Sequence, residues 1–252
     1  MMRLLDRIAI VTGGAGGLGT GICMAMAEDG AKVAIVVNSN LAGGHRLAAD
    51  IQKIYGTETM VIKADVSRSQ EVRDMVEAVY RRWSKIDILV NNAGLTSLKK
   101  IEEISEEEWD HVIEVNVKGH FLCAQNVIPY MKKQGSGKII NMGSLIGKNG
   151  GIISGGVYGT SKGAIHSFTF ALAKELAPFG IHVNAVAPGP IYTEMTKSMP
   201  PEKVKHMIEN IIPLKRFGTT KEVGKTIAFL ASSDADFITG EVIDINGGAY
   251  TD

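Results

Sequence analysis

The sequence predicts one doubly wound α/β domain, in which a parallel sheet of about seven strands carries helices on both faces. Short runs rich in Val, Ile and Ala alternate with longer stretches of helical spacing along the 252 residues. Most of the short runs are almost continuously apolar, which is typical of strands buried on both faces of a parallel sheet. No linker or low-complexity tract divides the chain, so the predicted domain extends over residues 1–252.

Strands and helices are expected to alternate along the chain. The strands are predicted at Ile8–Thr12, Lys32–Val37, Met60–Ala64, Ile86–Asn91, Lys138–Met142, Ile181–Ala187 and Val242–Ile245. The helices are predicted at Leu18–Glu28, Leu41–Ile54, Ser69–Trp83, Glu106–Met131, Ala164–Ala177 and Lys221–Ala231. This repeated order of strand and helix is that of a doubly wound sheet.

Hydroxyl and charged side chains mark the ends of two helices. Ser69 is the predicted cap of the helix that follows it, and Arg81 and Arg82 lie at the far end, where positive charge complements the helix dipole. Ser105, with Glu108 three residues later, fits a capping box. These signals place two of the helix N-termini.

Charge and composition exclude several classes of protein. The 27 Lys and Arg residues balance 27 Asp and Glu residues, so the chain lacks the basic surface of a nucleic-acid-binding or polybasic membrane protein. Two cysteines are too few for a disulfide scaffold and fit a reducing compartment. No signal peptide is visible, and no apolar run approaches the roughly 20 residues that span a bilayer. A soluble, cytoplasmic protein is expected.

A glycine-rich turn, Thr12–Gly19, follows the first strand and opens the first helix. Glycines let the backbone turn tightly and approach a pyrophosphate, which the helix N-terminus stabilises. The spacing of Gly13, Gly17 and Gly19 departs from the usual G-x-G-x-x-G fingerprint, and a plain tight turn is the alternative. The position between a strand and a helix favours dinucleotide binding.

Tyr158 and Lys162 are four residues apart, so on a helix they lie on one face and can serve one site. A tyrosine that acts as a base needs its pKa lowered from about 10 to about 7, which takes about 4 kcal/mol. One ammonium group about 4 Å away supplies about that much at an effective dielectric near 20. A surface Tyr–Lys pair is the alternative interpretation.

Further polar residues follow the predicted strands. Asn91–Gly94 ends the fourth strand, Ser144 follows the fifth, and Asn116 lies in a helix. Ligands of open parallel sheets bind at the carboxyl ends of the strands. Each residue alone could be a helix cap or a core amide, but their joint occurrence favours a functional site.

Two other kinds of site are weighed and set aside. Gly159–Gly163 matches the G-x-S-x-G elbow of serine hydrolases, which requires a strand directly before it, whereas Gly150–Gly156 is a glycine-rich loop. The histidines form no H-x-x-x-H or Cys/His cluster, so no metal site is predicted. They are His45, His111, His120, His166, His182 and His206.

These motifs resemble the short-chain dehydrogenase/reductase family, and the resemblance extends over essentially the whole chain. Asp65-Val66, Pro188-Gly189, Thr193 and Gly240–Gly248 add to the match. The resemblance implies a Rossmann-type oxidoreductase that transfers a hydride between NAD(P) and a small secondary alcohol or ketone. Relatives are mostly homotetramers, which implies contacts through the fourth and fifth predicted helices and through Gly240–Gly248.

The resemblance also implies roles for individual residues. Tyr158 would be the general acid/base, and Lys162 would lower its pKa and hold the nicotinamide ribose. Ser144 would hydrogen-bond the reacting oxygen, and Asn116 would hold a water in a proton relay. The implied cofactor-binding residues are Gly13, Gly16, Gly17, Leu18, Gly19, Asn38, Asp65, Val66, Asn92, Ala93, Gly94, Tyr158, Lys162, Pro188, Gly189, Ile191 and Thr193.

The end of the second strand distinguishes NAD from NADP. NAD-specific relatives carry an acid where Val37 stands, and without it nothing repels a 2′-phosphate. The basic residue of many NADP enzymes is also absent, here and at Gly16. Asn38, Ser39 and Asn40 could donate neutral hydrogen bonds to a phosphate. This favours NADP(H) and leaves NAD(H) open.

Three functions stay under consideration. The favoured substrate is a small sugar, polyol or hydroxy acid, and the alternative is a 3-oxoacyl group on an acyl carrier protein. The carrier-protein enzymes commonly place arginines, for docking an acidic partner, where Gln134 and Phe179 stand. A non-catalytic nucleotide sensor of the same fold is disfavoured, because it has no need of the four catalytic residues.

The substrate pocket is expected to form from Leu145–Val157 and Glu194–Ile212. The second segment is expected to be a mobile lid, although its methionines fit helix packing equally well. Lys148 lies in the first segment and could meet an anionic substrate group, but a solvated lysine is the favoured interpretation.

Overall fold

A seven-stranded parallel sheet forms the centre of the computed structural model, which describes residues 2–97, 99–151 and 156–251. The strand order is β3-β2-β1-β4-β5-β6-β9. The strands are β1 (Ile8–Thr12), β2 (Lys32–Val37), β3 (Thr59–Lys63), β4 (Ile88–Asn91), β5 (Gly137–Met142), β6 (Ile181–Pro188) and β9 (Val242–Ile245). The predicted fold class is confirmed, and every predicted strand end lies within two residues of the observed one.

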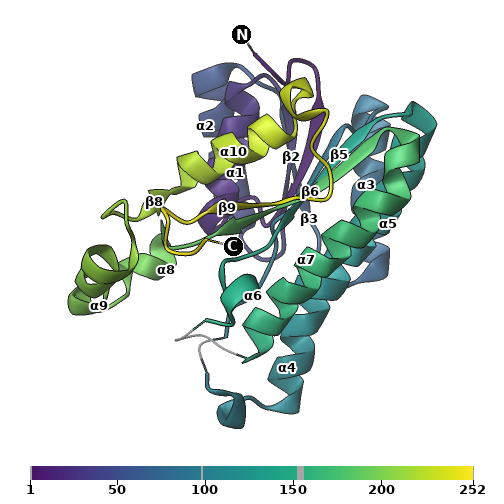
Figure 1. The fold of residues 1–252 in the computed structure, drawn as a ribbon. Helices are drawn as coiled ribbons and strands as arrows, with labels where there is room; N and C mark the ends of the chain where they lie inside the picture. The colour runs from purple at the N-terminus through teal and green to yellow at the C-terminus, as the bar shows by residue number, and fades with distance from the viewer. Residues whose placement is uncertain (1, 98, 152–155, 252) are drawn as a thin grey trace.

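Helices cover both faces of the sheet (Figure 1). One face carries α1 (Gly17–Glu28), α2 (Leu41–Tyr55) and α10 (Thr220–Leu230); the other carries α3 (Ser69–Trp83), α5 (Gly119–Gln134) and α7 (Gly156–Leu176). Apolar side chains of alternate strand residues, such as Val11 and Ile10, enter the two separate cores. This two-sided burial explains why the strand sequences are almost continuously apolar.

The direction of winding changes between β1 and β4. From β1 the chain proceeds outward to β2 and β3, and then returns to β4 on the other side of β1. The helix after β1 therefore packs on one face and the helices after β4 pack on the other (Figure 1). A crevice opens at such a point beyond the carboxyl ends of the strands, and ligands bind there.

The predicted helix Glu106–Met131 is interrupted. The structure has α4 (Glu106–Ile113), then a π-helical turn at Glu114–Lys118, then α5, which ends at Gln134. A π turn holds one extra residue per turn, so side-chain spacing alone does not reveal it. The Ser105 side chain caps α4 by accepting from the Glu108 backbone N–H at 3.2 Å. The Glu108 carboxylate binds Ser97 and Lys99, so only half of the predicted capping box forms.

Two other helix starts differ from the prediction. The helix α3 begins at Ser69 itself, with Arg68 as the extended residue before it, so the predicted Ser69 cap is wrong. The helix α7 begins at Gly156, eight residues before the predicted Ala164. Glycine has a low helix propensity and no side chain to show periodicity, which hides this first part of α7 in the sequence.

The structure also contains short elements that the sequence analysis did not predict. They are the short helices α6 (Ile146–Asn149), α8 (Glu194–Lys197) and α9 (Pro201–His206), a π turn at Met207–Ile211, the paired strands β7 (Ile191–Tyr192) and β8 (Gly218–Thr219), and 3-10 turns at Ile101–Glu103, Ala177–Phe179 and Ser233–Ala235. Throughout residues 2–97, 99–151 and 156–251, no helix has both the length and the apolar character to cross a bilayer.

Helices α1 and α10 cross in direct backbone contact. A Cβ atom on Gly21 would lie 2.5 Å from the Thr220 carbonyl oxygen, and one on Gly224 would overlap the Gly21 carbonyl. Both glycines are buried. A side chain at either position would force the two helices apart, because a close-packed interior has no space to absorb it.

We expect Gly224→Val to lower the free energy of unfolding by about 1–3 kcal/mol, the usual cost of overpacking a core. Thermal unfolding of the purified protein measures this. Lys221→Val on the same helix is the matched control, because the Lys221 side chain is 73% exposed and the substitution adds no buried volume. Equal melting temperatures for the two variants would contradict the close helix contact.

Candidate active site

One cavity of about 610 Å³ lies at the carboxyl edge of the sheet. Its walls come from the segments after five strands, β1, β2, β4, β5 and β6. Of the residues predicted from the sequence, it is lined by Gly13, Gly16, Gly17, Leu18, Asn38, Asn92, Ala93, Gly94, Ser144, Tyr158, Lys162, Pro188, Gly189, Ile191 and Thr193. The structure thus brings together residues that are far apart in the sequence.

The glycine-rich turn forms one end of this cavity. Gly13 and Gly17 have positive φ angles of 63° and 33°, which glycine adopts without strain. Helix α1 then begins at Gly17, and no side chain in the described part of the chain caps its N-terminus. Its first backbone N–H groups therefore stay available beside the cavity, and this arrangement suits the pyrophosphate of a dinucleotide.

Hydrogen bonds join the ends of β1 and β4 beneath the cavity. The Thr12 hydroxyl accepts from the backbone N–H groups of Asn92 and Ala93, at 2.9 and 3.0 Å. The Asn92 amide donates in return to the carbonyl oxygens of Thr12 and Gly13, at 2.9 and 3.1 Å. Asn92 thus holds the glycine-rich turn in place through its side chain.

In the segment after β2, the Asn40 side chain already forms two hydrogen bonds within the protein. Asn40 accepts from the Gly43 backbone N–H at 3.0 Å, as the cap of α2, and donates to the Ala15 carbonyl oxygen at 3.2 Å. This engages one of its two amide hydrogens, and its predicted hydrogen bond to a phosphate stays a prediction. Asn38 and Ser39 also line the cavity and are exposed. All three side chains are neutral donors in the lining.

Tyr158 and Lys162 lie one turn apart on α7 and both line the cavity, as predicted. Ser144, which follows β5, interacts with the Tyr158 hydroxyl and lowers the pKa of that phenol. Its hydroxyl accepts from the Ile146 backbone N–H at 3.2 Å. Both Ser144 and Tyr158 line the cavity.

The ammonium group of Lys162 is buried beside this pair. It donates to the Met142 carbonyl oxygen at 2.6 Å and lies 5.7 Å from the centre of the Tyr158 ring. Burial lowers the pKa of Lys162 to about 8, because the charged form loses its hydration. Tyr158 also differs from expectation: burial raises its pKa, and the bond from Ser144 offsets this only in part. Tyr158 is a protonated phenol in this state.

Asn116 lies behind the cavity wall. Its amide donates to the Leu95 carbonyl oxygen at 2.9 Å and accepts from the Leu95 backbone N–H at 2.7 Å. Its second amide proton goes to the Ser161 hydroxyl, also at 2.9 Å. The π turn brings Asn116 to this position, fully buried and in contact with the loop after β4.

Several predicted residues lie outside the cavity lining. Gly19 is in the first turn of α1, and the Val66 side chain contacts Gly119 of α5. The Asp65 carboxylate accepts from the backbone N–H and hydroxyl of Ser67, at 3.0 and 2.7 Å. The cofactor-binding roles of these three residues stay predictions.

The two segments predicted to form the substrate pocket contribute unequally. Ile146 represents the first segment in the cavity lining, and residues 152–155 of that segment lie outside the described residues. Lys148 is neither solvated nor directed to a substrate, because it forms an ion pair with Asp244 at 2.8 Å. From the second segment, Glu194 and Thr196 line the cavity. The predicted mobility of this segment as a lid stays a prediction.

Sequence analysis missed some residues of the site. The Met142 carbonyl oxygen is a backbone group, for which a sequence carries no signal. Leu95, Thr96 and Gly143 also line the cavity. Ser161 lies within helix α7 and donates to the Tyr158 carbonyl oxygen at 2.8 Å, so the G-x-S-x-G match is not a nucleophile elbow. Among the residues described, no three His, Cys, Asp or Glu side chains gather as a metal site would require.

Comparison with known proteins gives a consistent result. The family model described as enoyl-(acyl carrier protein) reductase matches residues 13–250. The 3-oxoacyl-acyl-carrier-protein reductase FabG of Staphylococcus epidermidis is 41% identical over 249 residues, which cover 98% of this chain and 100% of that protein. The FabG protein of Thermotoga maritima is 39% identical over 258 residues and covers 98% and 99%.

A solved structure agrees with these sequence relatives. The crystal structure of a protein from Sinorhizobium meliloti 1021, assigned as a short-chain alcohol dehydrogenase, superimposes with a TM-score of 0.92 at 35% identity, and the match covers 98% of both chains. Sequence and fold therefore lead to the same conclusion over nearly the whole length. The chain belongs to the short-chain dehydrogenase/reductase family of oxidoreductases.

Proposed function

We propose that this protein is a nicotinamide-dependent reductase that converts a ketone to a secondary alcohol, and the reverse, with Tyr158 as the general acid/base. The observation that carries the proposal is the Ser144–Tyr158 hydroxyl pair, which faces one cavity together with Lys162 and the glycine-rich turn. The family supports the reaction class.

The side chains suit this reaction. A nicotinamide, when bound, supplies or accepts the hydride at the substrate carbon. Tyr158 gives its proton to the carbonyl oxygen as the alcohol forms, and Ser144 donates a hydrogen bond to that region. The phenolate that remains is stabilised by the Lys162 ammonium group in a site of low dielectric. The glycine-rich turn and the α1 N-terminus would hold the pyrophosphate.

The proposed cofactor is NADP(H), with NAD(H) as the alternative. No carboxylate stands at Val37, so the site does not repel a 2′-phosphate. Asn38 and Ser39 are exposed at the cavity and can donate hydrogen bonds to it.

The proposed substrate is a 3-oxoacyl thioester. This follows the relatives named 3-oxoacyl-acyl-carrier-protein reductase, which match the chain over nearly its whole length. It replaces the sugar, polyol or hydroxy acid favoured from the sequence.

A smaller substrate stays the second candidate because of two surface residues. The Gln134 side chain bonds both backbone groups of Ile86, at 3.1 and 2.9 Å, and Lys132 lies 4.1 Å from the centre of the Phe179 ring. Gln134 and Phe179 thus stand where the carrier-protein enzymes place arginines that dock an acidic carrier protein, and both positions have other contacts here. A substrate that needs no carrier protein fits this surface.

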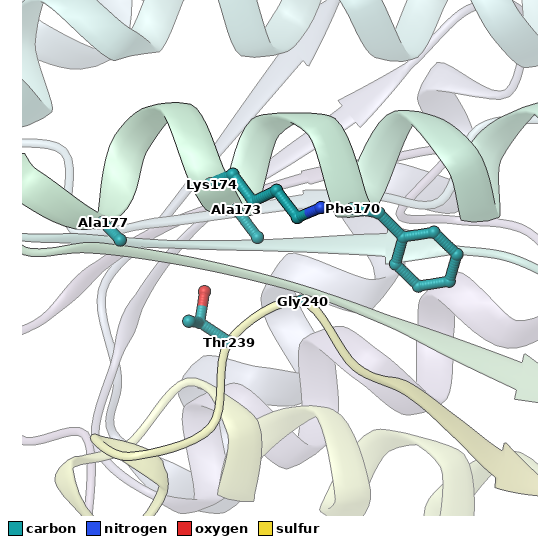
Figure 2. Close-up of a pocket in the computed structure, with 6 residues that line it drawn as sticks. All are labelled: Phe170, Ala173, Lys174, Ala177, Thr239 and Gly240. Atoms are coloured by element: carbon teal, nitrogen blue, oxygen red, sulfur yellow. The ribbon is translucent and has the colours of Figure 1, made fainter.

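We further propose a cytoplasmic homotetramer. The two cysteines, Cys23 and Cys123, are buried and free, as a reducing compartment requires. Phe121, Phe170 and Phe179 expose more than 40% of their surface on or beside α5 and α7. Phe170 lines a pocket of about 520 Å³. Figure 2 shows Phe170 on α7, with Gly240 on the neighbouring segment. Exposed aromatic side chains on long helices suit a contact with a second copy.

We expect Tyr158→Phe to lower kcat for ketone reduction by at least about 10³-fold, because the general acid is lost. The affinity for the dinucleotide should stay within about threefold, since the variant lacks only a hydroxyl group. Steady-state kinetics and fluorescence titration measure the two quantities. Unchanged turnover would refute the mechanism, and dinucleotide binding without any turnover in the wild type would indicate a sensor.

Side-by-side titration with NADPH and NADH tests the cofactor. We expect NADPH to bind at least about tenfold more tightly, which corresponds to about 1.4 kcal/mol. With the preferred cofactor, an oxoacyl carrier-protein thioester should be reduced faster than the coenzyme A thioester, and polyols should not be oxidised. Equal rates for the two thioesters would argue against carrier docking, and polyol oxidation alone would support the second candidate.

We expect Phe170→Glu to shift the assembly toward smaller species, because the charge would be buried in the proposed contact. Sedimentation velocity at micromolar concentration measures this. Phe237→Glu is the control, since Phe237 is the most exposed aromatic of the described residues and lies outside α5 and α7. A wild-type monomer would refute the tetramer.

A further inference from the structure

Ser161 is a buried hydroxyl group that the proposed reaction does not use. It lies three residues after Tyr158 on α7 and has no exposed surface. Its hydroxyl donates to the Tyr158 carbonyl oxygen at 2.8 Å and accepts from the Asn116 amide at 2.9 Å. Ser161 is therefore the direct connection between the helix that carries Tyr158 and the π turn that carries Asn116.

This connection continues to the cavity wall. The Asn116 amide pairs with both backbone groups of Leu95, at 2.9 and 2.7 Å, and Leu95 lines the cavity. The neighbouring Gly94 also lines the cavity, and a Cβ atom on it would lie 3.2 Å from the Asn116 amide oxygen and 3.7 Å from the Lys162 ammonium nitrogen. One hydrogen-bonded chain thus runs from the loop after β4, through Asn116 and Ser161, to Tyr158.

We propose that Ser161 is a positioning residue, which fixes Asn116 and the loop after β4 relative to Tyr158. This rests on the proposed reductase function. Without the Ser161 hydroxyl, one amide proton of the fully buried Asn116 loses its partner, and a buried unpaired donor drives local rearrangement. Any such shift changes the position of the loop after β4 relative to the Tyr158 hydroxyl. A misplacement of reacting groups by about 1 Å can lower the rate by about 100-fold.

The same helix offers a matched control. Thr169 is also fully buried, accepts from the Asn141 amide at 3.0 Å and donates to the Ile165 carbonyl oxygen at 2.8 Å. Its hydrogen bonds have the same chemistry as those of Ser161, but they connect α7 to Asn141 in β5, which does not line the cavity, rather than to Asn116 and the loop after β4. Loss of the Thr169 hydroxyl should therefore affect stability without affecting the reaction.

The test compares Ser161→Ala with Thr169→Val. We expect similar losses of thermal stability, dinucleotide affinity within about threefold of the wild type, and a kcat lower by about 10- to 100-fold in Ser161→Ala alone. If Ser161→Ala does not fold, Ser161→Cys preserves the volume with a weak donor and should show the same fall. A kcat equal to that of Thr169→Val would overturn the proposal.

A double-mutant cycle separates positioning from a general structural effect. If Ser161 acts through Asn116, the variant with both Ser161→Ala and Asn116→Ala should have the same kcat as Asn116→Ala alone. Independent, multiplying losses would overturn the proposal. The wild type and Tyr158→Phe are measured in the same assay: an inactive wild type overturns the proposed function and this inference with it, whereas an active wild type with an unaffected Ser161→Ala overturns the inference alone.

Discussion

The hydrogen bonds between Thr12 and Asn92 hold together the two strand ends on which the site depends. At this point the chain winds to opposite faces of the sheet, so the loops after β1 and β4 diverge and leave a crevice. The Thr12 hydroxyl and the Asn92 amide satisfy the backbone groups of these loops in both directions. Each loop is thereby fixed to the other strand, and the crevice keeps a defined width beside the α1 N-terminus.

Burial then sets the chemistry of the opposite wall. Both Tyr158 and Lys162 lose hydration in helix α7. Burial raises the pKa of Tyr158 and lowers that of Lys162, so it favours the neutral form of each group. The Met142 carbonyl oxygen and the Ser144 hydroxyl supply the hydrogen bonds that offset this cost. A phenol and an ammonium group of this kind are ready to exchange a proton once charge develops on a substrate oxygen, because little solvent has to reorganise.

The sequence predicts most of the sheet well because β1, β2, β4, β5 and β6 are almost entirely buried, whereas the edge strands β3 and β9 are largely half-buried. That burial leaves an almost continuous apolar run at each of β1, β2 and β5, which local composition detects. Prediction was weaker where a feature is not periodic. The π turn at Glu114–Lys118 interrupts a helix without any change in residue type, and the glycine-rich start of α7 shows no apolar stripe. The short elements α6, α8 and α9 are too brief to show a period.

The sequence by itself determined the fold class and the position of the glycine-rich turn between a strand and a helix, because both follow from local residue type and spacing. The catalytic roles of Ser144, Tyr158 and Lys162 come from the family resemblance and stay predictions. Only the tertiary structure decided how distant groups pair. It placed Asn116 behind the wall with Ser161, directed Lys148 to Asp244, and occupied Asn40 with the glycine-rich turn. These partners lie between 25 and 96 residues apart. Their contacts depend on the packing of whole helices and strands, which no local pattern of residues encodes.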